Sequence, residues 1–362
     1  MRGNTNIIGV LVLAALGLAS VKRVSRVGGD GVLRSITTQE GPKSAFVRIR
    51  RGVPDSSTNT ASGDSLFFAI RAEPVPRIMV RFQSGQIDLE SGEADVKKGV
   101  RFAVAFPRLI EYQETSGVEG FQAGSDTIVR NYNLRPASYF LQKNQSVSGD
   151  IKTVTFTASR SDQLVEFVYR FTDDLTTITN EAGSATIFPD EAKVDIKIRP
   201  NAVNNVSAGN SIAILARISY STASSDNSQG NTNKLKENAE SAVPDDVTFA
   251  SEDGFGAGFL NWERTVLVTY KNGSTQEKSV VAQLVMSNQM AGTVDQDAGN
   301  DDNVISFLSK TAWVAFSIPG NAADVASIFW DPAAGADSAA CTASRALALV
   351  LAMVSTMLLT VL

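Results

Sequence analysis

Histidine is absent from the 362-residue sequence, and cysteine occurs once, at Cys341. Without histidine, the chain can form neither a Ser-His-Asp nor a Cys-His catalytic system, and it cannot supply histidine ligands for zinc, copper or non-haem iron. It also lacks the side chain that most often changes charge near neutral pH. A chain with one cysteine cannot form an internal disulfide, so the hydrophobic core must hold the fold together. Carboxylate chemistry and binding are the functions left open.

Long segments with a helical apolar period of 3.6 residues are also missing between the two ends of the chain. Apolar and polar residues alternate instead, as Phe102, Val104 and Phe106 do with their neighbours. Such runs lie at 66–71, 78–82, 101–106, 151–158, 165–171, 194–198, 212–218, 266–270, 279–286 and 312–317. One apolar and one polar face per strand favours antiparallel sheets packed face to face. We therefore predict an all-β antiparallel sandwich, as one large domain or two packed ones.

The N-terminus has the pattern of a secretory signal peptide at 1–19. It begins Met1-Arg2, continues with an apolar run at 7–18, and ends with small residues. The apolar run is too short to span a bilayer comfortably.

The C-terminus has the pattern of a GPI-anchor signal at 334–362. Small residues at 335–340 precede a polar spacer and the apolar tail 346–362. A single transmembrane helix is the alternative, although the tail is shorter than the usual span of about 20 residues and no basic residue follows it. We expect the anchor to be attached at one of Gly335, Asp337 and Ser338. Each of these attachment sites would remove Cys341 from the mature protein.

Polar stretches suggest further divisions of the chain. We expect a basic, loop-rich leader at 20–64, a β-sandwich domain at 65–219, a polar linker or long loop at 220–246, and a second β region at 247–333. Residues 20–51 hold eight basic and two acidic residues, whereas the whole chain carries a net charge of −5. The basic segment could contact an anionic surface or extend as a solvated leader.

Acidic residues are concentrated in one later segment, where Asp295, Asp297, Asp301 and Asp302 lie within eight residues. Carboxylates are hard oxygen ligands of the kind that Ca²⁺ prefers, although the spacing does not follow the helix-loop-helix calcium pattern. The two interpretations are a calcium site and a solvated acidic loop. A weaker second candidate consists of Glu114, Glu119 and Asp126. We expect no other cofactor.

Three Asn-x-Ser sequons begin at Asn144, Asn205 and Asn272. In a chain that enters the secretory pathway, they are candidate N-glycosylation sites on surface segments. No phosphate-binding loop of the Walker type and no nucleic-acid-binding motif is present.

Segment 99–134 resembles the acidic skeletal organic matrix proteins of stony corals. A strand, an acidic loop and a Tyr-x-Leu follow one another in both, and the matching residues here are Phe106, Glu111, Tyr112, Asp126 and Tyr132. Segments 188–193, 262–263 and 328–332 are similar as well. The resemblance implies a secreted, surface-attached β protein, and mineral binding is a known role of that family. The long acidic runs and the cysteines of the coral proteins are missing here, so a wider extracellular family could contain both.

These features predict a GPI-anchored extracellular cell-surface or matrix protein with a structural, adhesive or binding role. Association with mineral or with Ca²⁺ is one form that this binding role could take. Its expected location is the outer face of the plasma membrane or the extracellular matrix. Its expected partners are the membrane, through the lipid anchor, and an extracellular protein, glycan or mineral surface, but no nucleic acid. We do not expect an enzyme. The alternative is a secreted carbohydrate-active enzyme that uses carboxylates, although spacing alone does not identify a catalytic pair.

Overall fold

The computed structural model describes residues 25–27, 33–55, 60–88, 94–135, 138–222, 246–250, 257–285 and 310–337. These residues form two ten-stranded antiparallel sheets, here named sheet A and sheet B, and one two-stranded sheet. The prediction of an all-β antiparallel sandwich is confirmed. In the described part of the chain, the one helical element is a 3-10 turn at Ala322–Asp324, and no helix is long and apolar enough to cross a membrane.

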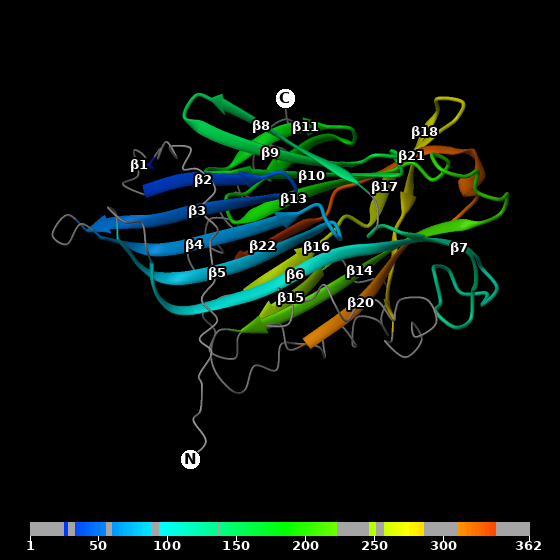
Figure 1. Ribbon diagram of the computed structural model, residues 1–362, viewed down its shortest axis with the longest axis horizontal. Helices are drawn as coiled ribbons and strands as arrows, with labels where there is room; N and C mark the ends of the chain where they lie inside the picture. Colours follow the sequence, from blue (N-terminus) through cyan, green and yellow to red (C-terminus); the bar gives the residue numbers. More distant parts are fainter. Residues whose placement is uncertain are drawn as a thin grey trace, which may run out of the picture.

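Sheet A contains most of the N-terminal half of the chain. Its strand order is β1 (Ser25–Val27), β2 (Leu33–Gly41), β3 (Ser44–Asp55), β4 (Thr60–Arg71), β5 (Arg77–Asp88), β6 (Ala94–Gln113), β14 (Ser211–Thr222), β20 (Lys310–Ile318) and β19 (Val281–Val285), while β7 (Thr127–Asn133) pairs with β6. Strands β2 to β6 follow one another as a meander of adjacent strands (Figure 1).

Sheet B forms the second layer of the sandwich. Its strand order is β15 (Asp246–Ala250), β16 (Ala257–Asn261), β22 (Ala333–Asp337), β13 (Glu191–Ile198), β10 (Val165–Thr172), β9 (Ile151–Arg160) and β8 (Tyr139–Ser148). Strand β21 (Val325–Trp330) joins β13 to β17 (Thr265–Tyr270), which pairs with β18 (Thr275–Ser279). A separate hairpin consists of β11 (Thr176–Asn180) and β12 (Gly183–Ile187).

The hydrophobic core lies between the two sheets and is rich in aromatic rings. Phe68 of β4 packs on Phe171 of β10 with ring centroids 4.9 Å apart, and Phe106 of β6 packs on Phe167 at 5.4 Å. At one edge, the Lys152 ammonium of β9 donates to the Ile36 carbonyl of β2 at 3.3 Å. The inward side chains of both sheets are therefore buried, and the outward side chains are left to provide binding surfaces.

The sequence-based division into two β regions differs from the observed topology. Strand β14 pairs with both β6 and β20, and β13 pairs with both β10 and β22, so strands from 65–219 and 247–333 alternate within each sheet. The two regions form one sandwich because each supplies neighbours that the other needs to complete its backbone hydrogen bonds. Residues 1–19 lie outside the described residues, as do most of the expected linker and of 334–362.

The expected loop-rich leader at 20–64 is wrong from residue 33 onward, because β2, β3 and the start of β4 are strands. The inward side chains of β3, Ala45, Val47 and Ile49, are buried in the core. Their outward neighbours include arginines, so this strand has a high positive charge as well as a period of two. The predicted run at 279–286 is also divided, since β18 belongs to sheet B and β19 to sheet A.

A candidate anion-binding face

Strands β3 to β6 and β14 turn alternate side chains away from the core, because successive residues of a strand point to opposite faces of the sheet. Directly paired residues of neighbouring strands share a face, so the register defines rows of outward side chains. Eight arginines occupy these outward positions, namely Arg48, Arg50, Arg71, Arg77, Arg81, Arg101, Arg108 and Arg217. We name this surface the arginine face.

One row crosses four strands in the middle of the arginine face. It places Arg48 opposite Phe67, Phe67 opposite Arg81, and Arg81 opposite Arg101. Adjacent strands lie about 4.8 Å apart, so Arg81 and Arg101 are direct neighbours and Arg48 is two strands away. Partial burial lowers the pKa of Arg81, and the positive charges of Arg101 and Arg48 lower it further. The row therefore concentrates positive charge.

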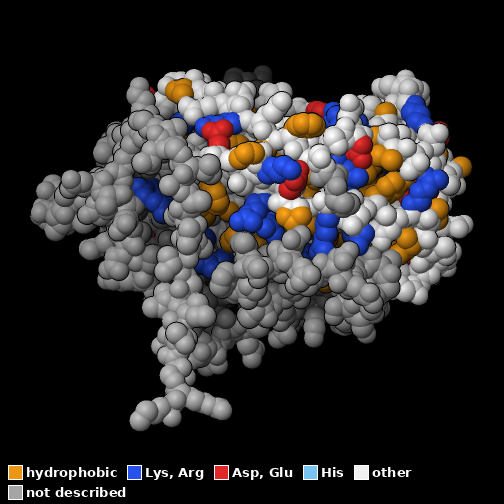
Figure 2. All heavy atoms as spheres, viewed as in Figure 1, with side chains coloured by type: hydrophobic (Ala, Val, Ile, Leu, Met, Phe, Trp, Pro, Cys, Tyr) orange, Lys and Arg blue, Asp and Glu red, His pale blue; other side chains and the backbone are white. Residues whose placement is uncertain are grey.

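Aromatic side chains lie among the arginines. The rings of Phe46 and Phe67 stack with centroids 5.7 Å apart, and the Arg217 guanidinium lies 6.0 Å from the centre of the Trp313 ring. Figure 2 shows Lys and Arg side chains across the middle of the view, with hydrophobic and a few acidic side chains between them. Guanidinium groups stack on aromatic rings and bind planar oxyanions through two parallel hydrogen bonds.

The arginines differ in their access to solvent. Arg50, Arg77 and Arg217 are buried, with 8%, 4% and 7% of their surface exposed. Arg48, Arg71 and Arg101 are partly exposed, and Arg81 is exposed. Among the described outward positions of 44–50, 65–71, 77–81 and 101–105, none is Asp or Glu. The described part of this face therefore gathers arginines within a chain of net charge −5, and clustered positive charge of this kind attracts anions.

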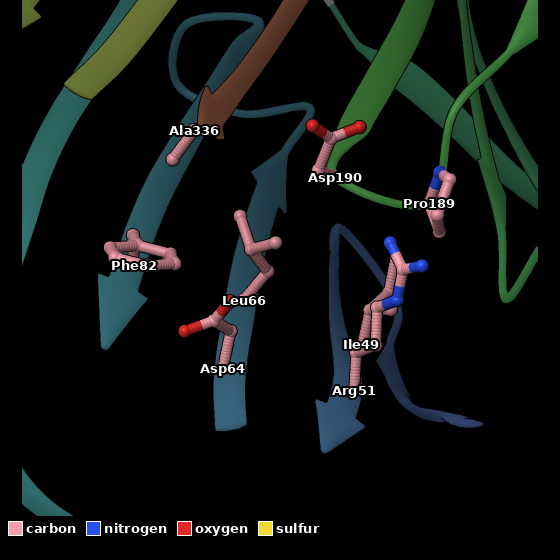
Figure 3. A pocket seen from close by; sticks show the side chains of 8 residues that line it. All are labelled: Ile49, Arg51, Asp64, Leu66, Phe82, Pro189, Asp190 and Ala336. Carbon is pink, nitrogen blue, oxygen red and sulfur yellow. The ribbon is translucent and has the colours of Figure 1, made fainter. Parts of the chain in front are cut away.

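The cavity between the sheets near β22 is too small for a larger ligand. Its volume is 20 Å³, which is room for about one water molecule. Figure 3 shows Ile49, Leu66 and Phe82 as its apolar lining, with Arg51, Asp64 and Asp190 among the polar residues. We therefore do not regard this cavity as a binding site.

The expected calcium residues Asp295, Asp297, Asp301 and Asp302 lie outside the described residues. Where the chain is described, no three acidic or cysteine side chains are grouped closely enough to hold a metal ion. The second candidate, with Glu114, Glu119 and Asp126, is therefore not brought together.

Asp126 instead organises the loop between β6 and β7. Its carboxylate accepts hydrogen bonds from the backbone N–H groups of Thr115 at 2.9 Å, Ser116 at 2.9 Å and Gln122 at 2.7 Å. Burial alone would raise the pKa of Asp126, but these hydrogen bonds bring it below its usual value. Its oxygens therefore stabilise the loop by accepting these backbone hydrogen bonds.

All three sequon asparagines are exposed. Asn144 lies on the edge strand β8, Asn205 lies in the loop before β14, and Asn272 lies in the turn between β17 and β18. The Asn272 side-chain oxygen accepts hydrogen bonds from the backbone N–H of Ser274 at 2.9 Å and from its hydroxyl at 2.7 Å. The fold leaves room for a glycan at each position.

Two of the candidate anchor residues belong to β22. Gly335 lies within the strand, between Glu191 and Phe259 of its neighbours, and Asp337 is the last residue of the strand. Ser338 lies outside the described residues. A chain that ends at Gly335 would lose the last two residues of β22, whereas a chain that ends at Asp337 or Ser338 would keep the whole strand.

No protein-family model matches the chain, and no curated protein matches it.

Proposed function

We propose that this is a GPI-anchored extracellular surface or matrix protein whose arginine face binds anionic polymers, such as sulfated or carboxylated glycans. The row formed by Arg48, Phe67, Arg81 and Arg101 carries the proposal. It comes from four strands of one rigid sheet, so the charges keep a fixed spacing. A ligand therefore gains several contacts without ordering the protein first.

A linear polyanion suits this row better than a single small anion. Its regularly spaced charges can reach guanidinium groups on successive strands, while Phe46 and Phe67 offer apolar surface to the C–H faces of sugar rings. Binding also releases the counterions that surround the polymer, which favours association at low salt. Mineral binding was expected through carboxylate side chains. The arginine face is cationic, so it does not support that mode of binding.

The two terminal signals support a location outside the cell, and the position of β22 refines the anchor. Attachment at Asp337 or Ser338 is favoured over Gly335, because Ala336 is buried and pairs with Gly258 of β16. A lipid anchor there would tether sheet B to the membrane through a short linker.

Salt-dependent binding to an immobilised sulfated polysaccharide tests the proposal. The test variant carries Arg48→Gln and Arg81→Gln, and the matched control carries Arg199→Gln and Lys271→Gln, which lie outside the arginine face. Exposed charge contacts are worth about 0.7 kcal/mol each, so the test variant should bind about tenfold more weakly at low salt. The slope of log K against log salt should fall by about 1.5 to 2. Equal losses in the two variants would refute the arginine face as the binding surface.

A further inference from the structure

A buried ion pair in sheet B joins two segments that lie far apart in the sequence. The Lys193 ammonium of β13 lies 3.2 Å from a carboxylate oxygen of Asp331, and the two side chains are 11% and 9% exposed. Three other lysine–carboxylate pairs each leave one side chain much more accessible, namely Lys43 at 55%, Glu40 at 47% and Glu181 at 46%. Removing two opposite charges from water carries a large desolvation penalty, so this pair calls for a specific explanation.

The backbone holds Asp331 beside Lys193. Asp331 and Pro332 connect β21 to β22, and both of these strands pair with β13. Ala333 lies directly opposite Lys193, and the Val194 N–H donates a hydrogen bond to the Pro332 carbonyl at 2.8 Å. The two side chains therefore meet in the folded sheet without any rearrangement of the chain.

The β11–β12 hairpin adds a further contact to the pair. The Asn180 amide donates a hydrogen bond to the same Asp331 oxygen at 3.4 Å. The neighbouring Glu181 forms an ion pair with Lys197 of β13, which ties the hairpin to the strand that carries Lys193. A hydrogen-bond donor at the Asp331 carboxyl group can stabilise negative charge that develops on its oxygen.

A third carboxyl group lies in the same pocket. The pocket has a volume of 460 Å³, and Glu263, Lys193 and Asp331 are among its lining residues. Partial burial and then the Asp331 charge raise the pKa of Glu263, while Lys193 opposes the rise. Glu263 therefore stays protonated to a higher pH than a solvated glutamate does, and its acid form can pass a proton to a leaving group.

We propose that Lys193 and Asp331 join in an intramolecular amide cross-link, which forms without an enzyme once the chain has folded. Two groups held in contact react as if at an effective concentration of about 10⁵–10⁸ M, which favours a condensation that is slow between separate molecules. The product is a neutral amide, so the reaction also removes two buried charges.

The reaction needs no oxidant or other reagent. The Lys193 ammonium first passes a proton to the Asp331 carboxylate, which leaves a neutral amine beside a carboxylic acid. The amine nitrogen then attacks the carboxyl carbon, a new C–N bond forms, and the C–OH bond breaks. The hydroxyl leaves as water with a proton from the nitrogen, which Glu263 can carry. One ammonium and one carboxylate thus become one amide and one water.

The place of the bond suits a protein that is held at its C-terminus, a consequence that rests on the proposed anchor. Asp331 precedes β22, the strand that leads to the proposed attachment sites Asp337 and Ser338. Force applied through the anchor acts first on the pairing of β22 with β13 and β16. A covalent bond from Asp331 to β13 passes this force into the interior of sheet B. It does so in a chain whose single cysteine, Cys341, cannot form an internal disulfide.

Peptide mapping of the full-length chain tests the proposal. Production in bacteria keeps the chain free of N-glycans and of a lipid anchor, and the reaction requires neither. Trypsin does not cleave after an acylated lysine. The cross-linked protein should therefore give a branched peptide that joins 171–197 to 311–345 and weighs one water less than the two peptides together. Fragmentation in the mass spectrometer should place the bond between Lys193 and Asp331.

Two matched variants separate the cross-link from the ion pair. Lys193→Arg keeps the positive charge but supplies no amine nucleophile, so it should give no branched peptide. Lys197→Arg changes a lysine of the same strand that pairs with the accessible Glu181, and it should give as much branched peptide as the unmodified protein.

The proposal is overturned if the folded, unmodified protein yields 171–193 and 194–197 as separate peptides and no branched product. This result does not depend on the folding of any variant. A branched peptide in Lys193→Arg would equally refute the assignment. The arginine face and the anchor take no part in the reaction, so failure of the polysaccharide test would leave the cross-link unaffected.

Discussion

Glu111 is a buried charged group whose removal should destabilise the fold strongly. Its side chain is fully buried on β6, with 0% of its surface exposed. One oxygen accepts hydrogen bonds from the backbone N–H of Ser207 at 2.9 Å and from the Asn210 amide at 2.6 Å. The other oxygen lies 3.4 Å from the Arg130 guanidinium of β7. Glu111 therefore joins β6, β7 and the loop that carries the sequon at Asn205.

The size of the effect follows from what each substitution leaves behind. Removing one partner of a buried ion pair costs about 3–5 kcal/mol, and Arg130 retains 37% exposure of its side chain, so Glu111→Ala should cost about 3 kcal/mol. Glu111→Gln keeps the shape and one acceptor but loses charge-assisted hydrogen bonds, which should cost about 1.5–2 kcal/mol. Arg130→Gln should cost about 3 kcal/mol, because it leaves the fully buried Glu111 carboxylate without its cation.

Urea denaturation followed by tryptophan fluorescence measures the three free energies of unfolding. Glu111→Ala and Arg130→Gln should each destabilise the fold more than Glu111→Gln, with an unchanged dependence on denaturant. A cost below about 1 kcal/mol for Glu111→Ala would refute the reasoning, because a buried carboxylate with these partners could not then be important for the loop.

Three further results are expected. Gly335→Ala should destabilise the fold by about 1–3 kcal/mol in the same assay, because a Cβ atom there would lie 2.3 Å from the Asp190 carbonyl oxygen, and a stabilised variant would contradict the packing of β22. Phosphatidylinositol-specific phospholipase C should release the protein from intact cells, whereas retention together with a surviving tag after Leu362 would indicate a helical anchor. A calcium site at the four clustered aspartates would make millimolar Ca²⁺ raise the melting temperature of the unmodified protein but not of an Asp297→Asn, Asp301→Asn variant, and equal melts in EDTA and Ca²⁺ would indicate a solvated acidic loop.

The alternation of apolar and polar residues along the chain was sufficient to predict the fold class. The runs at 101–106, 165–171 and 194–198 lie within β6, β10 and β13, and their apolar residues are buried in the core. Burial on one side and solvent on the other leave this local signature in each strand. Strand β3 alternates arginine with apolar residues, and β2 is mostly polar, so the charge and polarity of this segment mask its strand pattern.

The arginine face could not be located from the sequence in the same way. Arg48, Arg81 and Arg101 come from different strands, and only the register brings them into one row. Register depends on long-range packing, which a single sequence does not reveal. A local signal did exist, since Arg48 and Arg50, like Arg77 and Arg81, repeat with the period of a strand.

Arginine footprinting tests the central claim most directly. The full-length protein is treated with an arginine-specific dicarbonyl reagent, with and without a sulfated polysaccharide, and the modified residues are identified by mass spectrometry. The account predicts that the polysaccharide protects Arg48, Arg71, Arg81 and Arg101, and leaves the modification of Arg199 unchanged. Protection of Arg199 to the same degree, or no protection of the four face residues under conditions where the polymer binds, would contradict it.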